Sequence, residues 1–532
     1  MNKKYLIVII AILIIICAAA FALTKSNTSG NGSISIDANA LEDRGNLVVD
    51  SQSVNEDNVK YHSDSADVNA VLIKNGGSLI LSNAHIDKTG DTATTGDDAD
   101  FYGVNSAVLV NTNGTMDISN AEITTNSKGS NGIFVTNADA SSSSDGGSEQ
   151  GSGDGGQPPE ATGNGGGEGE QSPEVSGDGG QPPEMPDGNG GGDGGQPPEA
   201  TGNSGEDGGQ SPEKPDGNGG GPGQSTVEGT TEAKINNVKI TTHSDKSRGL
   251  DATYNGKINA ENVIINTDGQ SCAALATDRG EGEVHVDNSE INTGVSKSSG
   301  RGSPLIYSTG NITCDNTHGT SYVSQIACIE GKNSIELDNC DLTGYAEGNR
   351  QDGDTYVDLA GVFIYQSMSG DADVGTSTFT AKNTKLTIAE DSPVASEAPM
   401  FHITNTACVI NLENTECSFK SGTLLESSGQ NQWGTEGSNG GVCELNTNNE
   451  DLAGNVIVDS ISSLNWNMKN TQFKGAINST GNTTVSVSEG STWTLTGDST
   501  VSSLEVSGNI EYGDYSITVN GQTYNSSNPF KN

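Results

Sequence analysis

One short pattern recurs along this chain and constrains what it can fold into. The pattern reads apolar, any residue, apolar, any residue, Asn, two further residues and then usually an apolar residue. Alternation of apolar and other residues predicts a strand with one buried face. Asn is the non-glycine residue that best tolerates the left-handed conformation of a sharp bend. Each copy therefore predicts a short strand followed by a corner. The anchoring asparagines are Asn83, Asn120, Asn237, Asn262, Asn288, Asn316, Asn339, Asn383, Asn414 and Asn470.

The spacing of these anchors is typical of a solenoid. Where nothing intervenes, neighbouring anchors lie 25, 26, 28, 23 and 31 residues apart, which is a period found in stacked repeats. A second apolar segment recurs between anchors, for example at residues 107–110 and 361–365. Two or three short strands per coil, stacked coil on coil, predict a parallel β-helix of about a dozen coils.

Two copies near the C-terminal end are irregular. The segment that begins at Cys443 keeps the alternation but lacks the Asn, and Trp493-x-Leu495-x-Gly497 carries Gly in its place. Gly also suits a left-handed bend. Gly497 is therefore the predicted corner of the last clear copy.

An Asn at the same corner of successive coils resembles the asparagine ladder of right-handed parallel β-helices, the pectin-lyase-like superfamily. The resemblance covers residues 65–521 apart from one insertion, and it implies an all-β, right-handed parallel β-helix with the Asn side chains pointing inward. This fold carries lyases, hydrolases, adhesins and viral spikes, so it does not select an activity. Adhesin-like bacterial and archaeal surface proteins are the most similar group, and residues 493–508 resemble the last passenger coils of autotransporter adhesins.

The N-terminus predicts export. Lys3 and Lys4 precede an uncharged run of 19 residues, 5–23, which fits either a cleaved signal peptide or an uncleaved membrane anchor. In both cases the basic end stays inside and the rest is exported. The expected plan is a signal or anchor at 1–25, a linker and cap at 26–64, first coils at 65–140, an insertion at 141–226, the main β-helix at 227–521 and a tail at 522–532.

The insertion differs in kind from the repeats. Residues 141–226 hold eleven of the fifteen prolines, sixteen acidic residues and one basic residue. Such a composition cannot form a core and predicts an extended, disordered loop that leaves one coil and returns to the next. A solvated acidic tether is one interpretation. A partner-binding loop or a cell-wall-spanning segment is the other.

Overall charge limits the partners. The chain has 70 acidic and 25 basic residues, a formal charge of −45. Such a surface repels phosphate backbones and anionic lipid, which argues against nucleic-acid binding and leaves membrane contact to the N-terminal segment alone. The predicted location is extracellular or at the cell surface.

The scarce arginines suggest a ligand site. Arg248, Arg279 and Arg301 follow the anchors of three successive coils by 11, 17 and 13 residues. Stacked coils would align them, and an arginine row suits a uronate, sulfate or phosphate group. The alternative is local pairing with nearby aspartates. The predicted ligand-binding set is Arg248, Arg279, Arg301, Tyr254, Asp251 and Asp278.

Two acid-rich loops are candidate Ca²⁺ sites, because clustered carboxylates supply the oxygen ligands that Ca²⁺ takes. Solvated loops are the alternative in so acidic a chain. No cofactor is required by either interpretation. The candidate ligands are Asp97, Asp98 and Asp100 in one loop and Asp352, Asp354 and Asp358 in the other.

An enzyme is not clearly indicated. Asn266-Thr267-Asp268-Gly269 resembles the first acidic motif of polygalacturonases, but the paired Asp, Gly-His-Gly and Arg-x-Lys of that family do not follow it. A glycosidase needs two converging carboxyl groups, so no catalytic residue is predicted. The expected function is an exported, adhesin-like binding protein that contacts glycan or another cell-surface ligand. A polysaccharide lyase or glycoside hydrolase, and a structural surface-layer component, are the alternatives.

Overall fold

The computed structural model describes residues 34–93, 97–138, 228–296, 303–348, 350–352 and 355–532. The predicted signal or anchor at 1–25 and the predicted insertion at 141–226 therefore lie outside the described residues. Within the described part of the chain, no helix is long and apolar enough to cross a membrane.

One coil shows how the pattern folds. Strand β13 (Lys257–Glu261) turns at Asn262 into β14 (Ile264–Thr267), and β15 (Leu275–Thr277) completes the coil. Alternate residues of β13 are buried and the others are exposed or half-buried. This alternation follows from the two-residue period of a strand, and it directs the apolar side chains to the inside of the coil.

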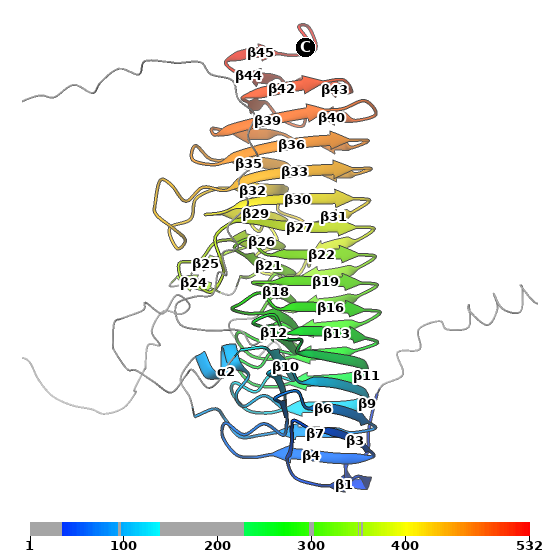
Figure 1. The fold of residues 1–532 in the computed structure, drawn as a ribbon. Coiled ribbons are helices and arrows are strands. Elements are labelled where there is room, and N and C mark those ends of the chain that lie inside the picture. The colour runs from blue at the N-terminus through cyan, green and yellow to red at the C-terminus, as the bar shows by residue number, and fades with distance from the viewer. Residues whose placement is uncertain (1–33, 94–96, 139–227, 297–302, 349, 353–354) are drawn as a thin grey trace, which may run out of the picture. The chain divides into compact units, whose positions relative to one another are not determined.

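Successive coils pair in parallel and in register. β13 pairs with β16 (Glu283–Asp287), β14 with β17 (Glu290–Thr293), and β12 (Leu250–Thr253) with β15. Repetition of this pairing generates a 23-stranded sheet and a 16-stranded sheet, whose strands follow one another in chain order in Figure 1. The predicted all-β parallel β-helix solenoid is confirmed.

The first and last coils bound this stack. β1 (Glu42–Asp43) already pairs in parallel with β4 (Val59–Ser63), so coiling starts before the first predicted anchor. At the other end, β45 (Gln522–Tyr524) turns back antiparallel on β44 (Ile517–Val519). That hairpin ends the parallel order.

The core is a column of inward side chains. In three successive coils Leu445, Trp466 and Val485 stand in register, and all three are almost wholly buried. The Trp466 indole N–H donates to the Thr447 hydroxyl at 3.1 Å, so the polar edge of this ring is satisfied inside the coil.

The predicted corners are confirmed. All ten anchoring asparagines have φ between 47° and 57°, the left-handed region that Asn tolerates. The inward orientation is wrong, because these side chains are exposed or half-buried and the next residue, such as Ala84 or Val263, is buried instead. The left-handed residue turns the chain so that its own side chain faces outward.

Amide hydrogen bonds run along the outside of the corners. Asn237 donates to Asn120 at 2.7 Å, and Asn339 donates to Asn316 at 2.7 Å. Elsewhere a carboxylate takes one place, as where Asn383 donates to Asp338 at 3.0 Å. The row is therefore a mixed Asn and Asp row at the surface.

The corners of both irregular copies lie at positions that were not predicted. In the first, Asn449 has φ 58° and is the corner, but Thr447 occupies the preceding inward position and hides the motif. In the second, Gly490 has φ 85°, whereas Trp493 lies in β40 (Thr492–Thr494), which follows the corner. The prediction of Gly497 as that corner is wrong.

We expect Asn288→Ala to lower the free energy of unfolding by about 1–2 kcal/mol, because Ala is strained in the left-handed region. Asn288, with φ 49°, also donates to Asn262. Asn288→Gly loses the same amide but accepts the bend, so it should cost less. Urea denaturation followed by circular dichroism measures both variants, and equal losses would contradict a conformational cause.

Candidate functional site

Most of the predicted ligand-binding set converges on the outer face of the 16-stranded sheet. Asp251 lies in β12, with Arg248 just before that strand and Tyr254 just after it. Asp278 and Arg279 follow β15 on the next coil, which pairs with β12. The stacking of two coils thus brings these five residues together. Arg301 lies outside the described residues.

Arg248 is the centre of this group. Its guanidinium lies 2.7 Å from the Asp278 carboxylate, 3.2 Å from Asp100 and 3.5 Å from Asp251, and Lys246 lies 3.0 Å from Asp100. Arg248 is only 9% exposed. We call these five residues the Arg248 cluster. It holds three carboxyl groups and two cations.

The acids of the cluster differ in their protonation. Burial raises the pKa of Asp251 to about 7, and Arg248 opposes this rise only in part. Burial likewise raises the pKa of Asp278 well above its usual value. Burial also acts on Asp100, but Arg248 and Lys246 hold its pKa below the ordinary value. Asp100 is therefore ionised at neutral pH, while Asp251 exchanges a proton in that range.

Helix α2 (Asp97–Tyr102) covers this cluster. The rings of Tyr102 and Tyr254 stack with centroids 5.8 Å apart, and the Arg279 guanidinium lies 3.9 Å from the centre of the Phe101 ring. The Thr253 hydroxyl donates to the Phe101 carbonyl at 2.9 Å. Stacking, cation–π contact and the Asp100 ion pairs together hold α2 against the sheet.

Arg279 is also engaged by an aspartate. Its Nε donates to Asp371 at 3.1 Å, from the segment that follows β26 (Val362–Tyr365). Both described arginines of the predicted row thus have acidic partners. Those of Arg248 include the nearby Asp251 and Asp278, as the alternative interpretation supposes. The partner of Arg279 is instead 92 residues away in the chain. Guanidinium groups used in this way are not open to an anionic ligand unless those partners move.

The candidate Ca²⁺ ligands have other partners or lie outside the description. Asp100 already pairs with two cations, and Asp358 accepts a hydrogen bond from the Trp433 indole at 2.8 Å. Among the residues that the structure describes, no group of three or more His, Cys, Asp or Glu is placed to hold a metal ion. The side chains of Asp97, Asp98 and Asp352, and all of Asp354, lie outside the described residues.

The polygalacturonase-like segment is the end of β14 and the bend that follows it. Asn266 accepts from the Asn292 amide at 3.1 Å on the outer face of the sheet, and Thr267 is buried. The Asp268 carboxylate accepts from the Ser296 backbone N–H of the next coil at 3.1 Å. These contacts assign the segment a structural part in the coil.

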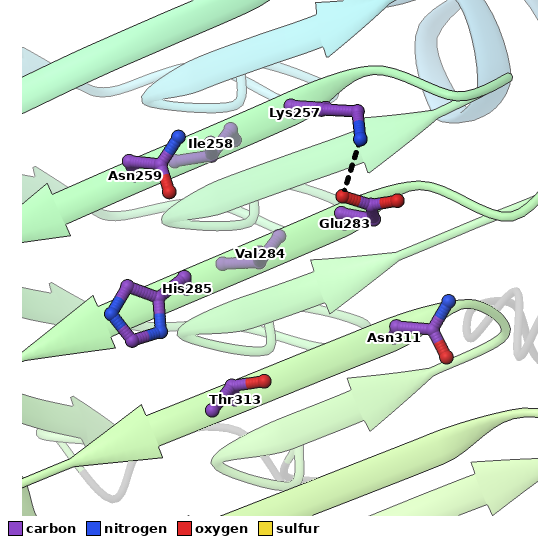
Figure 2. A pocket seen from close by; sticks show the side chains of 8 residues that line it. All are labelled: Lys257, Ile258, Asn259, Glu283, Val284, His285, Asn311 and Thr313. Atoms are coloured by element: carbon purple, nitrogen blue, oxygen red, sulfur yellow. Dashed lines mark hydrogen bonds and ion pairs between the residues drawn. The ribbon is translucent and has the colours of Figure 1, made fainter.

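A second candidate site lies on the outer face of the 23-stranded sheet. Figure 2 shows a shallow groove across β13, β16 and β19 (Asn311–Asp315). Polar side chains point outward from each strand, and Ile258 and Val284 point inward between them. Lys257 and Glu283 form an ion pair at 2.7 Å across the groove. The groove is lined by Lys257, Ile258, Asn259, Glu283, Val284, His285, Asn311 and Thr313.

Sequence reasoning missed this groove because the motif treats its residues as unspecified. Asn259, His285 and Thr313 occupy the same outward position in three successive copies, and the strand register places them side by side. Alignment of the outward positions of neighbouring copies would have found this row.

The two sheets differ in how far other segments of the chain cover their outer faces. Outward residues of the 16-stranded sheet such as Phe134 and Phe363 are buried, and Trp433 packs 4.5 Å from the Tyr365 ring on that face. Outward residues of β13, β16 and β19 are instead exposed or half-buried. The uncovered groove is therefore the more accessible of the two candidate sites.

The fold defines a class, a parallel β-helix protein with one sheet face covered over its middle coils and another face open at the groove. Neither the comparison with protein-family models nor that with curated protein sequences finds a match to this chain. Function is therefore inferred from the sites alone.

Proposed function

We propose that this chain is an exported, surface-exposed β-helix protein that binds glycan through the groove on its 23-stranded sheet. The observation that supports it is the in-register row of hydrogen-bonding side chains Asn259, His285 and Thr313, on a sheet face that remains open across β13, β16 and β19. A row on consecutive coils repeats every 4.8 Å or so. That repetition suits a linear ligand laid across several strands.

The chemistry of the groove matches sugar hydroxyls. Amide, imidazole and hydroxyl groups both donate and accept hydrogen bonds, as do the hydroxyls of a glycan. The one lysine of the groove is neutralised by Glu283, and the chain carries a formal charge of −45. Like-charge repulsion therefore favours a neutral glycan over a polyanion.

Export and surface location are part of the same proposal. The apolar N-terminal run supports export, with the chain either anchored by that run or released. The acidic, proline-rich insertion suits a solvated tether at a cell surface. In this proposal the membrane is contacted by the N-terminal segment only.

A hydrolase or lyase is the second candidate, and one observation favours it. Asp251 and Asp278 lie beside the same arginine with raised pKa values, and an acid that titrates near neutral pH suits general acid catalysis. Both are enclosed below α2, at 0% and 4% exposure. Catalysis at this place would require α2 to move away.

Asn259→Ala with His285→Ala should weaken glycan binding by about tenfold or more, because each lost hydrogen bond contributes about 1 kcal/mol. A glycan array with the purified chain identifies the ligand, and titration measures its affinity. Asn446→Ala with Asn467→Ala is the matched control, since both residues are half-buried, outward and in register on other coils. The control should bind within about twofold of the native chain.

The outcomes separate the candidates. Equal affinity of both double variants for a bound glycan would contradict the groove as the binding site. Release of new reducing or unsaturated ends, abolished by Asp251→Asn, would replace the binding proposal with the enzyme.

A further inference from the structure

Two cysteines face each other across neighbouring coils. Cys408 lies in β30 (Ala407–Glu413) and Cys443 in β33 (Val442–Asn448), and the parallel register pairs them directly. Both side chains point into the core, where they are 2% and 3% exposed. Both thiols are free in the structure.

This placement suits a covalent bond. Paired residues of neighbouring strands have Cα atoms about 4.8 Å apart, within the range of about 4.4–6.8 Å that disulfides span. Both side chains also leave their strands on the same side of the sheet. Direct pairing and a shared direction bring the two side chains together, and a bridge also needs the Cβ atoms to approach within about 3.5–4.5 Å.

Other cysteines of the described strands lack this arrangement. Cys314 pairs in register with Leu337, Cys328 with Phe363 and Cys417 with Leu386. Cys340 follows a corner, and its thiol donates to the backbone carbonyl of Cys314 at 3.3 Å. The Cys408 and Cys443 pair is thus distinct within the described strands.

The environment of the pair decides when oxidation can occur. The pKa of Cys443 is raised well above its ordinary value, first by its hydrogen bond with the Cys408 thiol and then by burial. The thiolate is the reactive form, and both side chains are enclosed in the core, so the closed coil protects the pair. Oxidation has to take place before the coil closes, while the chain folds.

We propose that Cys408 and Cys443 form a disulfide that closes one coil of the solenoid when the chain folds in an oxidising compartment. One protein thiolate attacks a low-molecular-weight disulfide such as oxidised glutathione, and one glutathione thiol leaves. The second protein thiolate then attacks the mixed disulfide and releases the second glutathione thiol. Two protein thiols are oxidised, one external disulfide is reduced, and their protons pass to the released thiols.

The bond would secure the segment that carries Trp433. The ring closed between residues 408 and 443 contains Trp433, which packs on Tyr365 and donates to Asp358. These contacts cover the outer face of the 16-stranded sheet. A crosslink at the two ends of the ring lowers the entropy of its open states, so it keeps this cover closed.

The test uses the full chain. It is unfolded in denaturant with reductant, refolded in a mixture of oxidised and reduced glutathione, then alkylated under denaturing conditions and mapped by peptide mass spectrometry. The expected result is two fewer alkylated thiols than in the reduced chain and a peptide that joins Cys408 to Cys443. The crosslinked chain should unfold at higher urea concentration than the same sample after reduction.

Variants fix the assignment. Cys408→Ala and Cys443→Ala should each leave the remaining partner alkylated, whereas Cys328→Ala should keep the crosslink. Chain secreted into an oxidising bacterial periplasm gives the same readout without refolding. Full alkylation of both cysteines in the folded chain from both routes, or crosslinks that join other cysteines instead, would overturn the proposal.

Discussion

Arg248→Met should lower the free energy of unfolding by about 3–5 kcal/mol at pH 8, because it leaves buried carboxylates without their cation. Arg248 contacts Asp100, Asp251 and Asp278, and Met keeps most of its apolar volume. The loss should be smaller at pH 5, since burial raises the pKa of Asp251 to about 7 and that group is then neutral. Urea denaturation at both pH values measures the difference.

Lys382→Met is the matched control for Arg248→Met. Lys382 pairs with Glu336 at 3.0 Å, but its side chain is 41% exposed, and exposed pairs contribute about 0–1 kcal/mol. A loss at Arg248 no larger than that at Lys382, or one that is the same at both pH values, would show that the cluster is not an enclosed charge system.

Relative to the native chain, Asp251→Asn should gain up to about 4 kcal/mol of unfolding free energy between pH 4 and pH 8. The reason is that burial raises the pKa of Asp251 from 3.8 to about 7. The folded state binds this proton more tightly than the unfolded state does. In the native chain, protonated Asp251 therefore contributes its full stabilisation below a pH of about 3.8, and this contribution is lost as the pH rises towards 7. Asn imitates the protonated carboxyl and removes that loss.

The measurement is the difference in unfolding free energy between native chain and variant across this pH range. Asp514→Asn, at an exposed position, is the control, because surface substitutions of this kind change the free energy of unfolding by about 0.5 kcal/mol or less. Glu450 keeps some pH dependence in the variant, because burial raises its pKa to about 7 as well. A difference that is flat, or that favours the native chain as pH rises, would contradict the proton on Asp251.

The corners and strands were predictable because they depend on neighbouring residues. Alternation determines the two faces of a strand, and the corner at Asn288 depends on the left-handed φ angle of that one residue. The outward direction of its side chain was not predictable from alternation, since a left-handed residue breaks the period of two. Thr447 hid the corner at Asn449 for a related reason, because a hydroxyl that bonds the Trp466 indole inside the coil looks like an outward residue.

The site was predictable only where coil stacking decides it. Arg248 and Asp278 belong to consecutive coils, so the repeat brings them together. Asp100 was assigned to a Ca²⁺ loop, yet it joins Arg248 from 148 residues earlier in the chain. No local pattern marks such a contact, because the loop before Asp100 and the insertion after it obscure which coils are neighbours.

The parallel register also shows where this chain holds a long insertion without disturbing the stack. β9 (Thr115–Thr125) pairs without a shift with β11 (Glu232–Thr242), although their paired residues are 117 apart in number. The Thr231 hydroxyl donates to Asn137 at 2.7 Å, so the chain re-enters the stack beside the point where it left. A folded domain whose two ends lie close together would fit between residues 137 and 231. The solenoid could then carry that domain on its side without a change in the strand register.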